Sequence, residues 1–207
     1  FSNIVWDASA NTLYNRNIFG IARSDIGGFE QKVSKSVNTG TILTVAKNND
    51  FTSSNLEASR TGLPNDESYL LFGDNNDAST VPYTPTEIGD CGELIGSETD
   101  IKLITRKWLA QRTNNICTTY LQVNLASYAS TLNSGIYMFV ADDSNFTQNV
   151  LMVPGTNDGN NWTFAHNFDN EAATRYITFG GTFVAAPCEQ CQGGTYNLRT
   201  GYQWNQG

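Results

Sequence analysis

The feature that most limits how this chain can fold is a set of short stretches in which apolar and polar residues alternate. In residues 118–125, one face holds Thr119, Leu121, Val123 and Leu125, and the other holds Tyr120, Gln122 and Asn124. A period of two places one set of side chains in a core and the other in water. Residues 175–184 show the same pattern. The alternation therefore predicts β-strands, each with one buried face.

Turn-forming clusters of Gly, Asn and Asp separate these stretches, as at residues 27–28, 75–76, 133–135 and 157–159. Only residues 7–15 favour one or two helical turns. Many strands without intervening helices imply an all-β fold, an antiparallel β-sandwich of jelly-roll-like type. The predicted strands span residues 3–6, 17–23, 41–46, 68–73, 101–109, 118–125, 135–141, 150–153, 162–164 and 175–184.

The chain divides into a module and a tail. Its 207 residues suffice for one large sandwich, which we expect over residues 1–184. Residues 185–207 form a Cys- and Gly-containing hinge and then one further alternating stretch, a predicted C-terminal extra strand. A lone strand is unstable in water, so this strand must add to a sheet edge of its own or another copy. The residues proposed for this assembly strand are Tyr196, Leu198, Tyr202 and Trp204.

Composition narrows the partners and the location. Charged residues make up 15% and the net charge is −8. The scattered Lys and Arg argue against nucleic acid and anionic membranes, which require clustered positive charge. No stretch is long and apolar enough to cross a bilayer. Because Asn, Thr, Ser and Gly replace charged residues at the surface and the chain opens with Phe1, we expect a mature or excised segment of an extracellular protein.

Four cysteines are present, and in an extracellular chain an even number favours disulfides over zinc. Three pairings are open. In one of them, a Cys91–Cys117 disulfide joins the loops on either side of a predicted strand, and a tight Cys188–Cys191 disulfide forms in the hinge. The candidates are Cys91, Cys117, Cys188 and Cys191.

Loop clusters of Asp and Asn make calcium the most plausible ligand, because calcium takes oxygens from carboxylates, amides and carbonyls. The same residues also cap turns through their own side chains, which is the alternative explanation. No other cofactor is expected. The candidate ligands are Asp74, Asp77, Asp142, Asp143 and Asn145.

No catalytic constellation stands out, so we predict that the chain is not an enzyme. His166 is the single histidine, and any Ser-His-Asp or Cys-His arrangement would have to use it. We interpret it as an ordinary residue near the end of a strand. The glutamates occupy loop-like positions, without the strand-borne pair that glycoside hydrolysis uses.

Several segments resemble an uncharacterised extracellular module of large secreted bacterial surface proteins and adhesins. That module often lies beside concanavalin-like (laminin-G-type) domains. The resemblance implies a non-catalytic role at the bacterial cell surface and supplies no catalytic residues. The chain departs from the module at Ala22 and Ser24, where Gly and Asp are expected. The similar segments are residues 5–11, 17–25, 31–38, 68–75, 106–108, 140–146 and 176–179.

Together these observations predict a structural or adhesive module outside the cell. Its partners would be copies of itself or neighbouring domains of the same protein, with assembly into a filament through the tail strand as one variant. A carbohydrate-binding module is the alternative, suggested by the sandwich fold and an aromatic fraction of 12%. The binding target, the parent protein and the strand order are not encoded in any local pattern.

Overall fold

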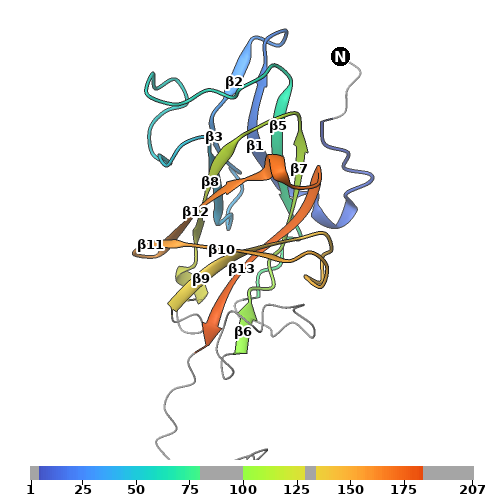
Figure 1. Cartoon of the computed structure of the whole chain (residues 1–207), viewed down its shortest axis with the longest axis vertical. Coiled ribbons are helices and arrows are strands. Elements are labelled where there is room, and N and C mark those ends of the chain that lie inside the picture. Colours follow the sequence, from blue (N-terminus) through green and yellow to red (C-terminus); the bar gives the residue numbers. More distant parts are fainter. Residues whose placement is uncertain (1–4, 80–99, 129–133, 184–207) are drawn as a thin grey trace, which may run out of the picture.

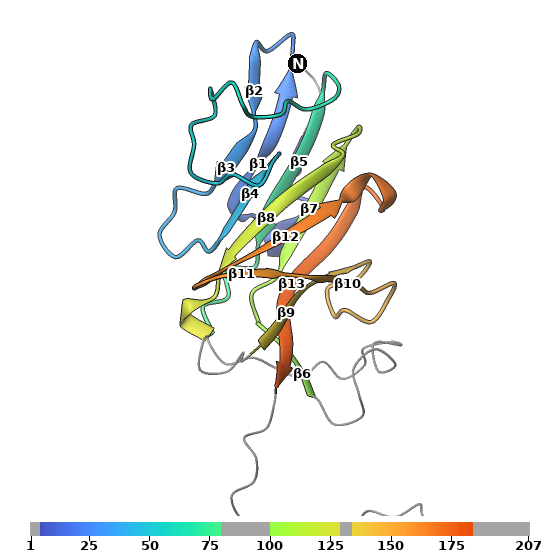
Figure 2. The same ribbon diagram turned by 60° about the vertical axis from the view of Figure 1, so that its left-hand side comes forward.

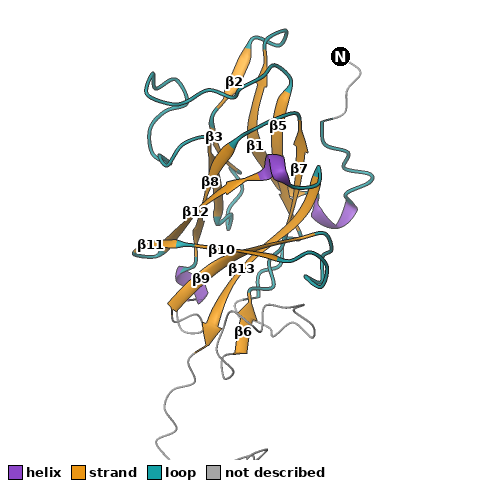
Figure 3. Ribbon diagram, viewed as in Figure 1, coloured by secondary structure: helices purple, strands orange, loops and turns teal. Residues whose placement is uncertain are grey.

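Two antiparallel β-sheets pack face to face in the computed structural model, which describes residues 5–79, 100–128 and 134–183. Figure 1 shows this arrangement, and it confirms the predicted all-β sandwich. The helical segments of the described residues are short 3-10 turns (Figure 3), and none is long and apolar enough to span a bilayer.

The elements are numbered in chain order. They are η1 (Thr12–Tyr14), β1 (Arg16–Ser24), β2 (Phe29–Gln31), β3 (Val33–Lys35), β4 (Leu43–Ala46), β5 (Ser68–Asp74), β6 (Asp100–Leu103), β7 (Trp108–Thr113), β8 (Thr118–Asn124), η3 (Ala126–Tyr128), β9 (Ser134–Ala141), β10 (Leu151–Pro154), β11 (Thr156–Asp158), β12 (Asn161–Asn167), η4 (Phe168–Asn170) and β13 (Thr174–Phe183).

The larger sheet has eight strands, in the order β10-β9-β13-β7-β5-β1-β2, with β6 also paired to β13. The smaller sheet has five, in the order β11-β12-β8-β4-β3. Strands β2 and β3 are separated by one residue, Lys32, yet they pair in different sheets. Strands β10 and β11 likewise change sheet, at Gly155.

These two crossing segments link the edge strands of the two sheets, β2 to β3 on one side of the described sandwich and β10 to β11 on the other. The second crossing requires glycine: a Cβ at Gly155 would lie 2.6 Å from the ring of Phe164. At the first crossing, the side chain of Asn55 donates to the carbonyl of Glu30 (2.6 Å) and accepts from the backbone N–H of Lys32 (2.5 Å).

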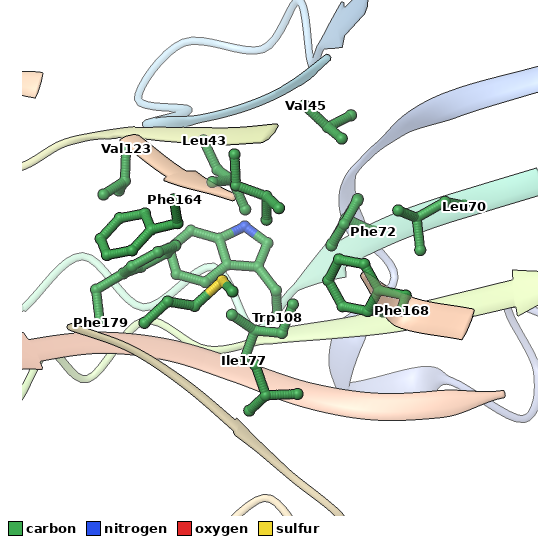
Figure 4. Packing of buried hydrophobic residues seen from close by; sticks show 14 of the residues in the cluster. Leu43, Val45, Leu70, Phe72, Trp108, Val123, Phe164, Phe168, Ile177 and Phe179 are labelled. Atoms are coloured by element: carbon green, nitrogen blue, oxygen red, sulfur yellow. The ribbon is translucent and has the colours of Figure 1, made fainter. Parts of the chain in front are cut away.

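The core lies between the sheets and centres on Trp108, whose side chain is fully buried. Figure 4 shows the indole among rings from both sheets. The centroids of Trp108 and Phe179 are 5.4 Å apart and those of Phe164 and Phe179 are 5.1 Å apart. The alternation that predicted the strands is confirmed, since Leu121, Val123 and Phe179 all point into this core.

A second, smaller apolar cluster covers the outer face of the larger sheet. The loop that follows β9 folds back and inserts Phe146, which is fully buried, against Phe139 and Leu103. This loop is therefore held by apolar packing as well as by its polar residues.

Two strand predictions are wrong in part. Val5 and Trp6 lie in a bend rather than a strand, and residues 3–4 lie outside the described residues. The predicted strand 101–109 is interrupted between β6 and β7. There the hydroxyl of Thr178 donates to the carbonyls of Ile104 (3.0 Å) and Arg106 (2.9 Å), so a side chain replaces the regular ladder. The predicted tail strand, with Tyr196, Leu198, Tyr202 and Trp204, lies outside the described residues.

Candidate functional site

A groove of about 470 Å³ opens on the outer face of the smaller sheet. We call it the Tyr120 groove. Its floor is the water-facing side of β8 and β12, one wall is the loop that follows β4, and the other is β11; Figure 2 shows β8, β12 and β11 across this sheet. The lining residues are Asn49, Asp50, Phe51, Thr52, Tyr120, Gln122, Thr156, Asp158, Thr163 and Ala165.

The strand register explains why Tyr120 dominates the floor. Tyr120 is paired with Ala46 of β4 on one side and with Ala165 of β12 on the other. Neighbouring side chains on one face of a sheet stand about 5 Å apart. The single methyl group of Ala165, which is exposed, therefore leaves the ring uncovered on the β12 side, whereas Ala46 on the β4 side is itself fully buried. The ring is half-buried, and its hydroxyl makes no hydrogen bond within the described residues.

A row of polar side chains lies next to the ring. Gln122, two residues further along β8, is paired with Thr44 and with Thr163, and Thr163 is paired in turn with Thr156. The amide of Gln122 and the hydroxyls of Thr44, Thr163 and Thr156 therefore form one line across β4, β8, β12 and β11. This row offers both hydrogen-bond donors and acceptors to whatever lies over it.

The loop wall is rigidly held by Arg60, of which only 3% is exposed. Its guanidinium donates to the carbonyls of Asp50 (2.7 Å), Ser53 (2.6 Å) and Ser54 (2.9 Å). A buried guanidinium with several carbonyl partners fixes the backbone it holds. Phe51 and its neighbours in the wall are thus preorganised beside the floor.

The carboxylate of Asp50 is also fixed within the wall. It accepts hydrogen bonds from the backbone N–H groups of Thr52 and Ser53, both at 3.0 Å. Hydrogen bonds from Ser53 and Thr52 hold the pKa of Asp50 far below its ordinary value of 3.8. Asp50 is therefore negatively charged at neutral pH.

The groove is acidic. Asp158 on β11 is exposed and faces it from the wall opposite Asp50. Among the described residues, the lining includes these two carboxylates and neither Lys nor Arg. The guanidinium of Arg60 lies 3.6 Å from the carboxylate of Asp50 and compensates its charge. The carboxylate of Asp158 has no ion-pair partner within the described residues and would repel a negatively charged ligand.

His166 lies away from the groove, on the inner face of β12 near its end, as an ordinary strand residue. It is 8% exposed, and its ring meets that of Phe168 edge-on at 4.5 Å. Burial lowers its pKa below the ordinary value of 6.5, although the nearby carboxylate of Glu171 raises it. No thiol or hydroxyl nucleophile is hydrogen-bonded to this ring among the described residues.

The lowered pKa of His166 predicts how stability depends on pH. Below pH 6.5 the unfolded chain takes up a proton that the folded chain resists, so the free energy of unfolding should fall as the pH decreases. The contribution of His166 should be fully present above pH 6.5 and its loss should not exceed about 1.4 kcal/mol per pH unit.

Urea unfolding at several pH values from 7.5 to 4.5 (roughly the interval in which a histidine titrates before the carboxylates do) measures this decline. His166→Phe keeps the aromatic contact with Phe168 and removes the titrating group, so its stability should vary less in this interval. An equal decline in the two proteins would contradict the assignment to His166.

The predicted calcium ligands Asp74 and Asp77 do not converge on a common point. Asp74 is fully buried and accepts from Asn17 Nδ2 at 2.9 and 3.0 Å and from the backbone N–H of Asn76 at 2.9 Å. Asp77 accepts from the N–H of Ser79 at 2.7 Å. These carboxylates serve as turn caps and partners of buried donors.

The second predicted calcium cluster shapes the loop that carries Phe146. Asp143 accepts from the backbone N–H groups of Asn145 (3.0 Å), Thr147 (2.8 Å) and Gln148 (2.8 Å). Burial raises the pKa of Asp143, but these hydrogen bonds together outweigh burial and leave the pKa below 3.8.

The neighbouring Asp142 pairs with Arg175 and accepts from Asn149 Nδ2. In the part of the chain that the structure describes, no group of three or more His, Cys, Asp or Glu side chains could hold a metal ion. The hydrogen bonds of both clusters match the turn-capping explanation of the Asp-rich loops.

Of the four cysteines, only Cys117 lies among the described residues, where it is exposed and free. Cys91, Cys188 and Cys191 lie outside them. No disulfide is present in the described part, and the predicted pairings stay predictions.

The groove combines residues that the sequence patterns singled out for other reasons or not at all. Tyr120 and Gln122 are on the predicted water-facing side of residues 118–125. An aromatic ring on that side was the sequence feature that could have indicated the groove. Two other aromatic residues do not contribute to the groove, since Trp162 is half-buried against the core and Tyr14 is buried. No sequence pattern pointed to Phe51, because its loop is held beside the floor by the hydrogen bonds of Arg60.

Comparisons with known proteins give a family and no function. No curated protein and no solved structure matches the chain. The model of a domain of unknown function, DUF8202, matches residues 2–174. Because this match covers most of the 207 residues, the chain belongs to the DUF8202 family.

Proposed function

We propose that this chain is a non-catalytic adhesive module of a bacterial cell-surface protein, and that it holds its partner in the Tyr120 groove. The observation that carries the proposal is the groove itself. It combines the half-buried ring of Tyr120 and a row of hydrogen-bonding side chains with a wall that is fixed by buried Arg60. Binding to preorganised groups avoids the entropic cost of ordering them.

The chemistry of the lining favours binding over catalysis. The groups that face the groove are carboxylates, amides, hydroxyls and aromatic rings. A general acid needs a pKa near the working pH, and the pKa of Asp50 is shifted in the opposite direction. Buried His166, on the inner face of β12, lies on the other side of the sheet from the lining.

Adhesion under flow tests the proposal. Beads coated with the full chain at fixed density are applied to surfaces of bacterial exopolysaccharide, mucin or extracellular-matrix protein, and the force that detaches them is measured. We expect retention on at least one surface, and we expect Tyr120→Ala to abolish it.

Phe29→Ala is the matched control, because it removes an aromatic side chain that is 49% exposed on β2 and does not line the groove. Adhesion that survives Tyr120→Ala would refute the groove as the binding surface. Beads that behave as uncoated ones on every surface would refute the adhesive role.

A further inference from the structure

We infer that the ligand of the Tyr120 groove is an uncharged glycan of at least two sugar rings. This inference rests on the proposed function and adds the chemical class of the ligand. It combines three properties of the groove: an aromatic ring uncovered on its β12 side, a hydrogen-bonding row at a fixed spacing, and the negative charge of Asp158.

The ring of Tyr120 provides a stacking surface. A pyranose ring has one face of C–H groups, which packs favourably on the negatively polarised face of an aromatic ring. Ala165 lies beside Tyr120 on the β12 side, is exposed, and does not rise to the height of the ring, whereas Ala46 on the β4 side is fully buried. A flat ligand can therefore approach the ring from the β12 side without displacing a side chain.

The spacing of the polar row suits a second sugar. Successive residues on one face of a strand are about 7 Å apart, so the row through Gln122 lies about that far from Tyr120. A sugar linked to the one on Tyr120 would place its hydroxyls over the amide of Gln122 and the hydroxyl of Thr163. Both groups can donate and accept, as a sugar hydroxyl can.

The charge of the groove selects among glycans. Asp158 and the ionised Asp50 can each accept hydrogen bonds from sugar hydroxyls. A uronic acid, a sialic acid or a sulfated sugar would meet the like charge of Asp158, whereas the charge of Asp50 is paired with Arg60. An extended basic peptide would satisfy the charge, but the floor is a sheet face and offers no open backbone groups to pair with it.

Nuclear magnetic resonance of the full chain, labelled with ¹⁵N, tests the inference. The probes are the neutral trisaccharides cellotriose, maltotriose and mannotriose, the anionic trigalacturonate, and the cationic peptide trilysine. We expect at least one neutral trisaccharide to shift the amide signals of Tyr120, Gln122 and Thr163. Trigalacturonate should bind at least about tenfold more weakly.

Variants assign the contacts. Tyr120→Ala should weaken binding about tenfold or more, whereas Tyr120→Phe keeps the ring and should stay within about threefold of the parent. Asp158→Asn removes one charge and should narrow the preference for neutral over anionic sugar. Phe29→Ala should bind as the parent does, and thermal melting of each variant separates lost binding from lost folding.

The outcomes distinguish the two proposals. If trilysine or trigalacturonate shifts the groove signals and no neutral sugar does, the ligand is not an uncharged glycan, and the adhesive role stands. If no probe shifts the signals but the beads still adhere in a Tyr120-dependent way, the inference of an uncharged glycan is likewise overturned and the adhesive role again stands. Adhesion that does not depend on Tyr120 would overturn the proposed function and this inference together.

Discussion

Trp108→Ala should lower the free energy of unfolding by about 3–5 kcal/mol, the cost of truncating a large buried aromatic side chain. The indole is fully buried at the centre of the core, where it meets the ring of Phe179 edge-on (Figure 4). It also lies where strands from both sheets converge, so neighbouring side chains cannot close the cavity without moving a sheet. We therefore expect the loss to fall at the upper end of this range.

Urea unfolding followed by circular dichroism measures the loss, and Trp108→Phe is the matched control. The indole Nε1 of Trp108 is buried and has no hydrogen-bond partner within the described residues. Phenylalanine leaves a smaller cavity and removes this unsatisfied donor, whose burial costs about 1–3 kcal/mol. Trp108→Phe should thus be clearly less destabilising than Trp108→Ala. Equal losses in the two variants would show that the cavity does not determine the cost.

The strands and turns were largely predictable because their signals are local. The alternation in residues 118–125 and 175–184 corresponds to β8 and β13, with the apolar set buried wherever its side chains are described. Each of the four turn clusters contains a residue with positive φ: Gly28 at 66°, Asn76 at 54°, Gly135 at 62° and Gly159 at 67°. A short-range steric preference is sufficient to place such residues.

The crossings between the sheets could not be predicted in the same way. Residues 29–35 form one extended stretch, and the pairing of β2 with β1 and of β3 with β4 divides it between the two sheets. The crossing at Gly155 depends on the ring of Phe164, a non-local contact. Strand order is decided by such contacts, and local alternation carries no information about them.

The candidate site was predictable only in its floor. Tyr120 and Gln122 follow from the alternation, whereas the wall with Asp50 and Phe51 depends on hydrogen bonds from Arg60, which is ten residues away from Asp50 along the chain. The Asp-rich loops were ambiguous for a physical reason. The same short side chains that can hold a metal ion also cap turns, and composition does not distinguish these roles.

Asp74→Ala is the second substitution with a large expected effect, a loss of about 3–5 kcal/mol in the free energy of unfolding. The carboxylate is 1% exposed, and it lies 3.9 Å from the guanidinium of Arg106, itself 8% exposed. It also accepts from Asn17 and from the N–H of Asn76. Removing it leaves the buried cation of Arg106 without its counter-charge, and it leaves the buried amide of Asn17 and the N–H of Asn76 without their acceptor.

A double-mutant cycle tests whether the loss arises from the stranded partners. Arg106→Met in the Asp74→Ala background removes the uncompensated positive charge, so the double variant should be less destabilised than the sum of the two single variants. Arg106 also donates to the carbonyls of Asp77 (2.8 Å) and Gly40 (2.6 Å), so its own substitution should be costly as well. Additive losses would mean that the two charges do not stabilise each other.

The same hydrogen bonds separate a structural role of Asp74 from calcium binding. If the carboxylate is committed to Asn17 and Asn76, chelation with EDTA or addition of calcium should leave the melting temperature of the parent chain unchanged. A metal present at 100 times its dissociation constant would instead add about 2.7 kcal/mol. A calcium-dependent rise in melting temperature that Asp74→Ala abolishes would therefore restore Asp74 as a ligand. Were the rise abolished instead by Asp143→Ala, calcium would belong to the loop that buries Phe146, and the role of Asp74 as a buried hydrogen-bond acceptor would stand.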